Sequence, residues 1–414
     1  MNVLLLDGDT KHSLAVARSL GKRGVEVHAA APSRLFNLAG YSRFCRKGIS
    51  CPPAEDAPRF LEAVSALVRS GKYEVLLPLK SVSAPLICRH RAIFEEHVRL
   101  ALPSSRSMEI AADKRLTFQF LREKGFPVPA TLFFQSLEEI RSAAASLRYP
   151  VVVKKALGSG GIYFANSLPD LLKHFPALIS RDGDRGGKIM PIVQEFIPGD
   201  GFGFFALFNR GDPRAVFMHH RLKEYPITGG PSVMAESCYD EKLKEMGLAI
   251  LKALDWHGVA MVEVKKDARD GDYKIMEINP KFWGSLDLAI ASGVDFPWLT
   301  YRMAREGDVE SVWDYRVGLK YRWLFPGEIL RLIALPRETP AFFRDFFRGP
   351  CAYDLEWGDP LPHLLQIAQI FGYLIKYRGR FRYPWGKPEF HRENAEKPLT
   401  ANLANLRESG KIDT

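Results

Sequence analysis

A predicted hairpin around residue 270 constrains the fold of this chain more than any other stretch. Two apolar-rich runs flank Asp270-Gly271, a dipeptide that is typical of tight β-turns. With the turn centred on Asp270, Glu263 and Glu277 fall opposite each other, because each lies seven residues away. Directly opposed side chains have Cβ atoms roughly 5 Å apart. Two carboxylates at that separation repel each other unless one is protonated or a cation lies between them.

Asn279 extends this pair into a set of oxygen ligands. Residues i and i+2 of a strand share a face, so Asn279 points to the same side as Glu277. Such oxygen ligands suit Mg²⁺ rather than zinc, and Mg²⁺ commonly accompanies phosphates. Lys281 and Ser285 follow directly, which brings phosphate-binding groups beside the cation ligands. The alternative explanation is an exposed hairpin with incidental acids.

An acid on one strand, followed by Glu-Ile-Asn-Pro and a basic residue on the next, resembles the metal-binding core of the ATP-grasp superfamily. Members of that superfamily mostly join a carboxylate to an amine, or to a similar nucleophile, through an acyl-phosphate made with ATP. The resemblance implies an ATP-grasp fold that mixes α/β and α+β architecture and is preceded by an open, parallel α/β domain. It also implies ATP and Mg²⁺ (or Mn²⁺) as cofactors, with Glu263, Glu277 and Asn279 as metal ligands.

The succession of strands, helices and loops predicts five parts. Strands alternate with helices at the start, which implies a parallel sheet with helices on its faces. The first turn, DGDTKHS, lacks the glycine spacing of a dinucleotide site, and the resemblance implies that this domain helps to hold the substrate. The parts are an α/β domain (1–103), a linking helix (104–127), a lid (128–190), a subdomain with the metal hairpin (191–307), and a helical, basic extension with a disordered tail (308–414).

Composition narrows the class of protein and the compartment. Hydrophobic content of 46% and charged content of 26% are ordinary for a soluble globular protein, and no run of 18 apolar residues occurs. Five cysteines without a Cys-x-x-Cys pair predict reduced thiols in a cytoplasmic protein rather than a zinc cluster. The N-terminus reads as a buried strand rather than a signal peptide. A net charge of +10 fits an anionic ligand, a nucleic acid or an anionic membrane surface.

Two lysines and a glycine-rich loop are the predicted phosphate-binding groups. Lys114 follows Asp113 near the start of the linking helix, where the resemblance implies a contact with nucleotide phosphates, although most helix lysines are merely solvated. Lys154 follows the apolar strand of the lid, and the resemblance favours it over Lys155. Backbone N–H groups of the next loop can turn toward phosphate oxygens, although many such loops are only hairpin tips. The predicted loop residues are Ser159, Gly160 and Gly161.

The resemblance also implies a hinge where the adenine base would sit. An edge strand there offers backbone N–H and C=O groups to the base, and Glu195, Phe196 and Ile197 are the predicted hinge residues. Many relatives carry an acid two residues after the hinge glycine, where it binds the ribose. This chain has Gly201 at that position, so Asp200 is the predicted substitute.

A basic strand before a Gly-Gly turn carries the predicted substrate contacts. Basic side chains in this setting suit an anionic substrate or the oxygens of an acyl-phosphate, and a basic edge strand with a polar tip is the alternative. Strand alternation puts His219 and Arg221 on one face and His220 on the other. Arg221 and Lys281 are the predicted catalytic residues, which would stabilise the oxyanion. A lone histidine is more often structural, so His219 is the lesser candidate.

The leading hypothesis is an ATP-dependent ligase that forms an amide-type bond between a small-molecule carboxylate and an amine. The alternatives are a carboxylase or kinase on the same scaffold, and a membrane-surface protein with a vestigial ATP site. Residues 362–392 combine an apolar helix with Arg, Lys, Tyr and Trp, which fits either a basic helical cap or a peripheral contact with anionic lipid. No nucleic-acid-binding motif is present, so no specific nucleic acid is expected. A homodimer is an open alternative to a monomer.

Overall fold

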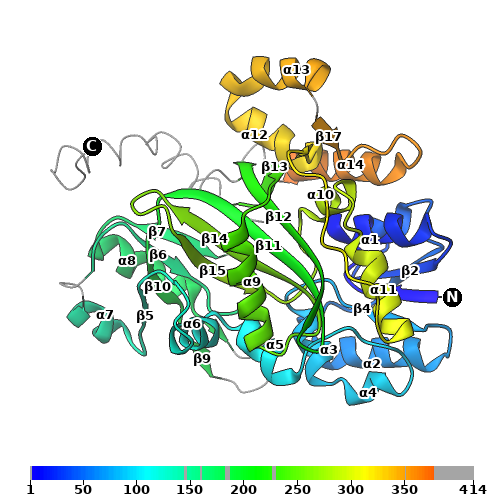
Figure 1. Cartoon of the computed structure of the whole chain (residues 1–414), viewed down its shortest axis with the longest axis horizontal. Helices are drawn as coiled ribbons and strands as arrows, with labels where there is room; N and C mark the ends of the chain where they lie inside the picture. Colours follow the sequence, from blue (N-terminus) through cyan, green and yellow to red (C-terminus); the bar gives the residue numbers. More distant parts are fainter. Residues whose placement is uncertain are drawn as a thin grey trace.

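A computed structural model describes residues 2–143, 147–158, 161–181, 187–225, 230–349 and 351–376 of the chain (Figure 1). A seven-stranded sheet occupies the centre. In this view the N-terminal domain lies to its right, the lid to its left and the C-terminal extension above. The combination of one parallel sheet with antiparallel and mixed sheets confirms the predicted fold class.

The N-terminal domain is a parallel sheet with helices, as the alternating pattern predicted. Its strands lie in the order β3-β2-β1-β4, and every pairing is parallel. The apolar residues of β1 and β4 are buried, which is typical of a parallel sheet covered by helices. Its elements are β1 (Asn2–Leu5), α1 (Lys11–Gly21), β2 (Glu26–Ala31), η1 (Ala39–Tyr41), β3 (Lys47–Ser50), α2 (Ala57–Arg69), β4 (Val75–Leu77), α3 (Ser83–Arg89) and α4 (Ala92–Glu95).

The linking segment contains two helices, α5 (Ser105–Ala112) and α6 (Lys114–Glu123), where the sequence predicts one. The break falls at Asp113, whose backbone is extended and whose carboxylate accepts a hydrogen bond from the N–H of Arg115. An aspartate with this geometry caps the start of a helix. As a result, Lys114 is the first residue of α6.

The lid is built on a four-stranded antiparallel sheet in the order β5-β10-β6-β7. Because β10 pairs with both β5 and β6, the prediction of an edge strand before the hinge is wrong. The sheet also carries the lid beyond residue 190, to the end of β10. The elements are β5 (Thr131–Phe133), α7 (Leu137–Ala143), β6 (Val151–Lys154), β7 (Ile162–Ala165), α8 (Leu168–His174), η3 (Phe175–Leu178), β8 (Ser180–Arg181), β9 (Lys188–Ile189) and β10 (Ile192–Glu195).

The central sheet has the order β15-β14-β11-β12-β13-β16-β17. Alternate residues of β11 pack on opposite faces: Phe204 and Phe208 lie with α9, whereas Phe205 and Leu207 lie with α11 and the N-terminal domain. Helix α9 packs behind the metal hairpin, and two helices, α10 and α11, close the subdomain. The elements are β11 (Gly199–Asn209), β12 (Asp212–Glu224), β13 (Ser232–Ser237), α9 (Glu241–Ala253), β14 (Gly258–Asp267), β15 (Tyr273–Asn279), α10 (Leu286–Ala291) and α11 (Phe296–Glu306).

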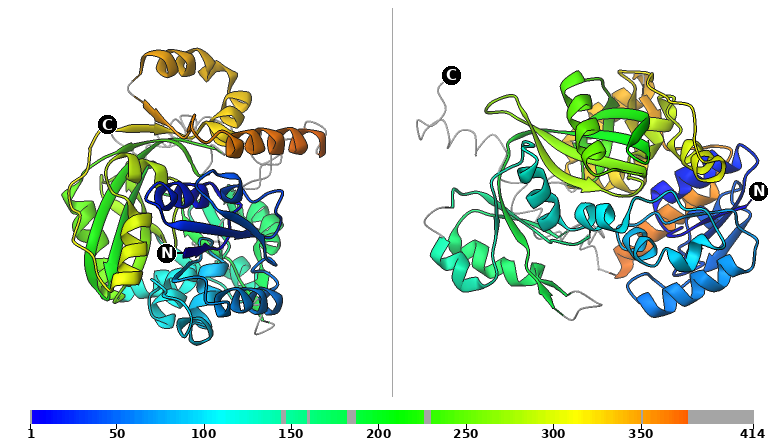
Figure 2. Two further views of the ribbon diagram at one scale, coloured as in Figure 1. Left: turned by 90° about the vertical axis from the view of Figure 1, so that its right-hand side faces the viewer. Right: turned by 60° about the horizontal axis from the view of Figure 1, so that its bottom comes forward.

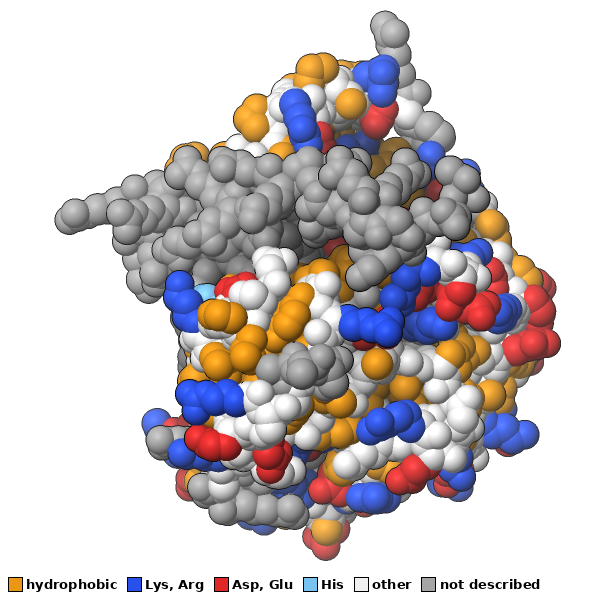
Figure 3. Space-filling model, turned by 90° about the vertical axis from the view of Figure 1, so that its left-hand side faces the viewer, with side chains coloured by type: hydrophobic (Ala, Val, Ile, Leu, Met, Phe, Trp, Pro, Cys, Tyr) orange, Lys and Arg blue, Asp and Glu red, His pale blue; other side chains and the backbone are white. Residues whose placement is uncertain are grey.

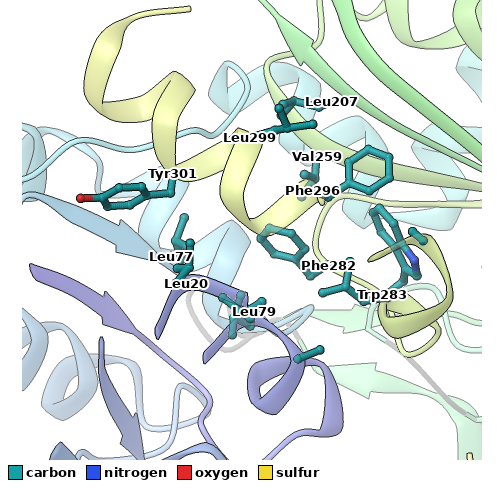
Figure 4. Close-up of a cluster of buried hydrophobic side chains, with 14 of the residues drawn as sticks. Leu20, Leu77, Leu79, Leu207, Val259, Phe282, Trp283, Phe296, Leu299 and Tyr301 are labelled. Atoms are coloured by element: carbon teal, nitrogen blue, oxygen red, sulfur yellow. The ribbon is translucent and has the colours of Figure 1, made fainter. Parts of the chain in front are cut away.

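One buried hydrophobic cluster joins the N-terminal domain to the central sheet (Figure 4). Leu20 and Leu77 come from the N-terminal domain, and Phe296 and Leu299 come from α11. Trp283, just after the metal hairpin, is 2% exposed in the same cluster. The two parts therefore share a core, which fixes the N-terminal domain beside the hairpin.

The C-terminal extension is mostly helical, as predicted, but it also adds two strands to the central sheet. Strand β16 pairs with β13, and β17 pairs in parallel with β16. Helix α14 lies over the N-terminal domain (Figure 2), where Arg18 pairs with Asp359 at 2.8 Å. The elements are β16 (Lys320–Arg322), the π-helical turn η4 (Leu324–Glu328), α12 (Ile329–Ala334), η5 (Pro336–Glu338), α13 (Thr339–Arg348), β17 (Cys351–Tyr353) and α14 (Leu361–Lys376).

Some predictions concern residues outside the described ranges. The predicted tail and the second half of 362–392 lie beyond residue 376. Among the described residues, no helix is both long and apolar enough to cross a membrane.

Candidate active site

The metal hairpin has the predicted register. Glu263 of β14 lies directly opposite Glu277 of β15, with a bulge immediately after this pair. The turn contains Gly271 at φ +74°, a left-handed conformation that glycine adopts without strain. Asn279 shares the face of Glu277, and its amide donates a hydrogen bond to that carboxylate over 2.7 Å. Two carboxylates and a carboxamide therefore converge as the sequence indicated.

Glu277 is held in its charged form. Burial alone would raise the pKa of this carboxyl, but Lys114, the Asn279 amide and Lys154 together lower the pKa to about 2. Lys114 Nζ lies 3.2 Å from Glu277 Oε2. A buried carboxylate that stays ionised at neutral pH is a ready ligand for a divalent cation.

Lysines from three separate segments surround the two acids. Burial, together with the nearby Lys114 ammonium, lowers the pKa of Lys154 to about 8, while Glu277 and Glu263 oppose this shift. Burial also lowers the pKa of Lys281, which lies within electrostatic range of Glu277 and Lys114. Neighbouring ammonium groups repel one another, and the two acids do not neutralise all of the positive charge of the three lysines. An anion such as phosphate would neutralise the remainder.

The glycine-rich loop begins beside these lysines. Lys114 Nζ donates a hydrogen bond to the carbonyl of Gly158 over 3.0 Å, and its backbone N–H donates to Ala156. Gly161 accepts a hydrogen bond from the backbone N–H of Lys155, so that the loop stem is closed. The predicted residues Ser159 and Gly160 lie outside the described residues.

Arg221 lies with the acids, as predicted, but it is already engaged. Its Nη2 atom is 2.6 Å from Glu263 Oε2, and its Nη1 atom is 3.3 Å from Glu224 Oε1. Burial raises the pKa of Glu224, which Arg221 opposes. Arg221 therefore orients Glu263, one of the three predicted metal ligands, and Glu224 in turn holds Arg221.

The predicted hinge residues lie where the lid meets the central sheet. The carbonyl of Ile197 accepts a hydrogen bond from Lys265 Nζ over 2.5 Å, and this ammonium also lies 5.3 Å from the Phe196 ring. Glu195 pairs with Arg269 at 2.6 Å. Asp200 does not join the acids: its side chain is 72% exposed and lies 3.3 Å from His220.

Four further groups near the site were not predicted from the sequence. The sequence does contain a signal for Lys265 and Glu224. Lys265 follows Glu263 by two residues on the same strand, and Glu224 follows Arg221 by three. Asp7 and His12 come from the N-terminal domain and both lie within electrostatic range of Lys281. Their approach depends on domain packing, which strand periodicity does not encode.

His219 belongs to the core. The side chain packs edge-on against Phe205 with ring centroids 4.7 Å apart, and neither ring nitrogen has a hydrogen-bond partner among the described residues. Burial lowers its pKa well below the usual value, so the ring is neutral. The structural interpretation of this histidine fits these contacts.

The residues fit a nucleotide with Mg²⁺. Asn279 donates its N–H to Glu277, which leaves its carbonyl oxygen available as a third oxygen ligand. Within the described ranges, no group of three or more His, Cys, Asp or Glu side chains is arranged to hold a metal. Oxygen ligands beside lysines are the arrangement that Mg²⁺ with phosphates requires.

Comparisons with known proteins agree with this arrangement. Residues 192–325 match the family described as "ATP-grasp in the biosynthetic pathway with Ter operon". A D-aspartate ligase from Enterococcus faecium is 25% identical over 296 residues, which cover 66% of this chain and 70% of that protein.

Solved structures share the fold. The L-amino acid ligase from Bacillus licheniformis has a TM-score of 0.59 and 16% identity, covering 75% of each chain. The biotin carboxylase domain of Hydrogenobacter thermophilus 2-oxoglutarate carboxylase, solved with MgADP, ADP and bicarbonate, has a TM-score of 0.62 and 15% identity. That match covers 77% of this chain and 73% of the other. The chain therefore has the ATP-grasp fold.

Proposed function

We propose that this chain, which belongs to the ATP-grasp superfamily, is an ATP-dependent ligase that joins a small carboxylate to an amine through an acyl-phosphate. The observation that carries this proposal is the pairing of Glu263 with Glu277 beneath three lysines from different segments. The similarity to a D-aspartate ligase favours a ligase over a carboxylase or a kinase.

The acids and lysines divide the work of binding ATP. Glu263, Glu277 and Asn279 would hold Mg²⁺ or Mn²⁺, which when bound neutralises the charge that develops during phosphoryl transfer. Lys114 and Lys154 bind the phosphates of ATP, and the loop that includes Gly161 covers these phosphates. The hinge at Glu195, Phe196 and Ile197 offers backbone groups to the base.

Lys281 and Arg221 have different roles in the proposal. Lys281 has no carboxylate within ion-pair distance in the part of the chain that is described, so its ammonium is available to a developing oxyanion. Two Nη atoms of Arg221 are already paired with Glu263 and Glu224. The proposed role of Arg221 is therefore to orient Glu263 as a metal ligand. Support of a metal ligand by a neighbouring side chain is typical of metal sites.

ADP release tests the proposed function. The full chain is incubated with ATP, Mg²⁺ and paired panels of small carboxylates and amines, and ADP is measured with the coupled product. Release that requires both a carboxylate and an amine supports the ligase. Release that requires bicarbonate instead indicates a carboxylase, and a stable phosphorylated product without amine indicates a kinase.

Nucleotide affinity is expected to fall as pH rises through 8. The free protein loses the Lys154 proton near its pKa of about 8, so above that pH binding of phosphate requires proton uptake. Titration calorimetry with Mg-ADP should show an affinity roughly tenfold weaker at pH 9 than at pH 7.5. Lys154→Arg should flatten this dependence, and Lys154→Met should weaken binding at both values. An unchanged pH profile in Lys154→Arg contradicts the assignment of Lys154.

We also propose that the extension contacts an anionic membrane surface. Leu361, Leu364 and Phe371 are 56%, 58% and 60% exposed and recur at helical spacing along α14. The sequence that follows, KYRGRFRYPWG, is rich in basic and aromatic residues. Exposed hydrophobic side chains also lie beside Lys and Arg at the top of the molecule (Figure 3). Apolar faces bordered by cations suit anionic headgroups.

Vesicle co-sedimentation measures this contact. The full chain is expected to sediment with vesicles containing anionic lipid, severalfold more than with neutral vesicles, because both apolar burial and charge contribute. Leu364→Glu with Phe371→Glu should abolish the difference. Leu35→Glu, at a leucine that is 59% exposed in the N-terminal domain, is the matched control. Equal sedimentation of the parent with both lipids would count against the membrane contact, and self-association in solution would indicate a second copy as the occupant.

A further inference from the structure

The C-terminal extension contacts the end of strand β12. Helix α12 lies at the ends of β12 and β13 (Figure 1), where Leu330 belongs to a small buried cluster with Tyr225 and Val233. Arg331, the next residue of α12, donates a hydrogen bond from Nη1 to the backbone carbonyl of Glu224 over 2.7 Å. The extension therefore holds the backbone of β12 at Glu224.

A second contact joins the neighbouring residue of β12 to the same part of the extension. Glu338, in the turn η5, accepts hydrogen bonds from Nε and Nη2 of Arg331 over 3.0 and 2.6 Å. The same carboxylate pairs with Lys223 at 3.0 Å. The side chains of Arg331, Glu338 and Lys223 are 12%, 20% and 22% exposed, so solvent screens these pairs less than pairs at the surface. Burial alone would raise the pKa of Glu338, but Arg331 and Lys223 lower the pKa to about 2.

The sheet by itself defines this end of β12 poorly. The pairing of β12 with β13 shifts register twice, between Arg221 and Lys223 and again between Lys223 and Glu224. Such shifts interrupt the ladder of backbone hydrogen bonds and bend the strand. Arg331 and Glu338 bind β12 at the two residues where the ladder is interrupted, so the extension adds the contacts that the ladder lacks.

These contacts lead to the metal hairpin through two ion pairs. Arg331 holds the backbone of Glu224, and the carboxylate of Glu224 lies 3.3 Å from Nη1 of Arg221. Nη2 of Arg221 lies 2.6 Å from the carboxylate of Glu263. A displacement of Glu224 would therefore move Arg221 and change the orientation of Glu263. Side chains that orient a metal ligand commonly change the affinity for the metal.

We propose that Arg331 and Glu338 are positioning residues for the Mg²⁺ site, and that they act on Glu263 through Glu224 and Arg221. This inference rests on the metal site of the proposed function and assigns the extension a role in that site. The family match ends at residue 325, so both positioning residues lie beyond the matched region. An extension that only packed on the sheet would affect stability, but it would not affect metal binding selectively.

The gain in ADP affinity that Mg²⁺ produces tests the inference without requiring turnover. Titration calorimetry measures ADP binding to the full chain without divalent metal and at saturating Mg²⁺, with Mn²⁺ as a second metal. The ratio of the two dissociation constants is the coupling between metal and nucleotide. Arg331→Met should lower this ratio about threefold to tenfold, which is less than the roughly 10- to 100-fold effect of removing a direct support of a metal ligand. ADP affinity without metal should not change.

Conservative and control variants separate positioning from folding. Arg331→Lys retains a donor for the carbonyl of Glu224, so it should recover most of the ratio. Glu338→Gln loses the charge but keeps an oxygen acceptor, so it should lower the ratio less than Arg331→Met does. Arg337→Met is the matched control, because Arg337 is exposed in the same turn, and it should leave the ratio unchanged. Unfolding temperatures of all four variants show whether the extension remains folded, and Glu338→Gln tests the inference if Arg331→Met does not fold.

A double variant tests whether Arg331 acts through Glu224. Glu224→Gln removes the charge that holds Arg221 and should itself lower the ratio. Arg331→Met should then have little further effect in the Glu224→Gln background, because residues that act along one path are not additive. Effects that multiply in full would show that Arg331 acts independently of Glu224.

Two results would overturn the inference. One is an unchanged ratio in both Arg331→Met and Glu338→Gln, and the other is full multiplication of the effects in the double variant. Absence of any gain from Mg²⁺ or Mn²⁺ in the parent would reject the metal site itself, and the inference with it. Failure of ADP release with every carboxylate and amine would reject the ligase, whereas the effect of Arg331→Met on the ratio would still decide the inference.

Discussion

Glu277→Gln is expected to slow ADP release at least about 100-fold, because it removes a charged metal ligand and the partner of Lys114. Glutamine keeps the size and one oxygen of the side chain, so the hairpin should fold normally. The loss should grow at low Mg²⁺ concentration, since a weaker ligand set needs more metal to fill. Rates measured across a Mg²⁺ series, with Mn²⁺ as a second metal, separate metal affinity from the chemical step.

Glu236→Gln is the matched control for this experiment. Glu236 lies in β13 opposite His220, and so faces away from Arg221 and the metal hairpin. This variant should release ADP at the parent rate. If Glu277→Gln does the same, the metal site has been assigned to the wrong residues. Unfolding temperatures of both variants show whether any loss of rate reflects folding.

Arg322→Met is expected to destabilise the extension by about 3–5 kcal/mol, the usual effect of removing one member of a buried ion pair. Arg322 is fully buried and lies 2.6 Å from Glu328 and 2.7 Å from Asp345. Its guanidinium also lies 5.5 Å from the ring of Phe342 on α13. Denaturant unfolding, together with limited proteolysis of residues 324–349, should reveal an early loss of this region.

The effect of Arg322→Met should depend on pH. Burial raises the pKa of Glu328 to about 7, and Arg322 opposes this shift. A carboxyl whose folded pKa exceeds its unfolded value binds more protons when folded, so stability falls as pH rises from about 4.5 to 7. Without Arg322 this fall should steepen, so the variant should be closer to the parent at pH 5 than at pH 8. Arg344→Met, at a residue that is 72% exposed, should change stability little at either pH.

Local periodicity explains how much of the site was predictable. The register of Glu263 against Glu277 follows from the alternation of side chains between the two faces of a strand and from the Asp-Gly turn. Both features can be recognised in the amino-acid sequence. Lys114 and Lys154 lie on separate segments, and the family resemblance indicated that both face the same phosphates. The hairpin and the lysines could thus be predicted from the amino-acid sequence.

The remaining features depend on contacts between distant segments. The interior position of β10 in the lid requires pairing with both β5 and β6, which a single strand does not reveal. The pairing of Arg221 with Glu224 spans three residues, but it also needs Glu263 from another strand. Strands β16 and β17 are three residues each and pair across an intervening helical segment. Short strands in a helical context carry little periodic signal.

The place of β16 in the central sheet has a practical consequence. The backbone of β16 forms hydrogen bonds with the edge of β13 that faces away from β12. Without β16, the N–H and C=O groups along that edge would have no partner strand. A version of the protein shortened to residue 307 would have β13 as an exposed edge strand, which can pair with a strand of another molecule. Such a fragment should aggregate during expression, although it retains every residue that is proposed to contact ATP.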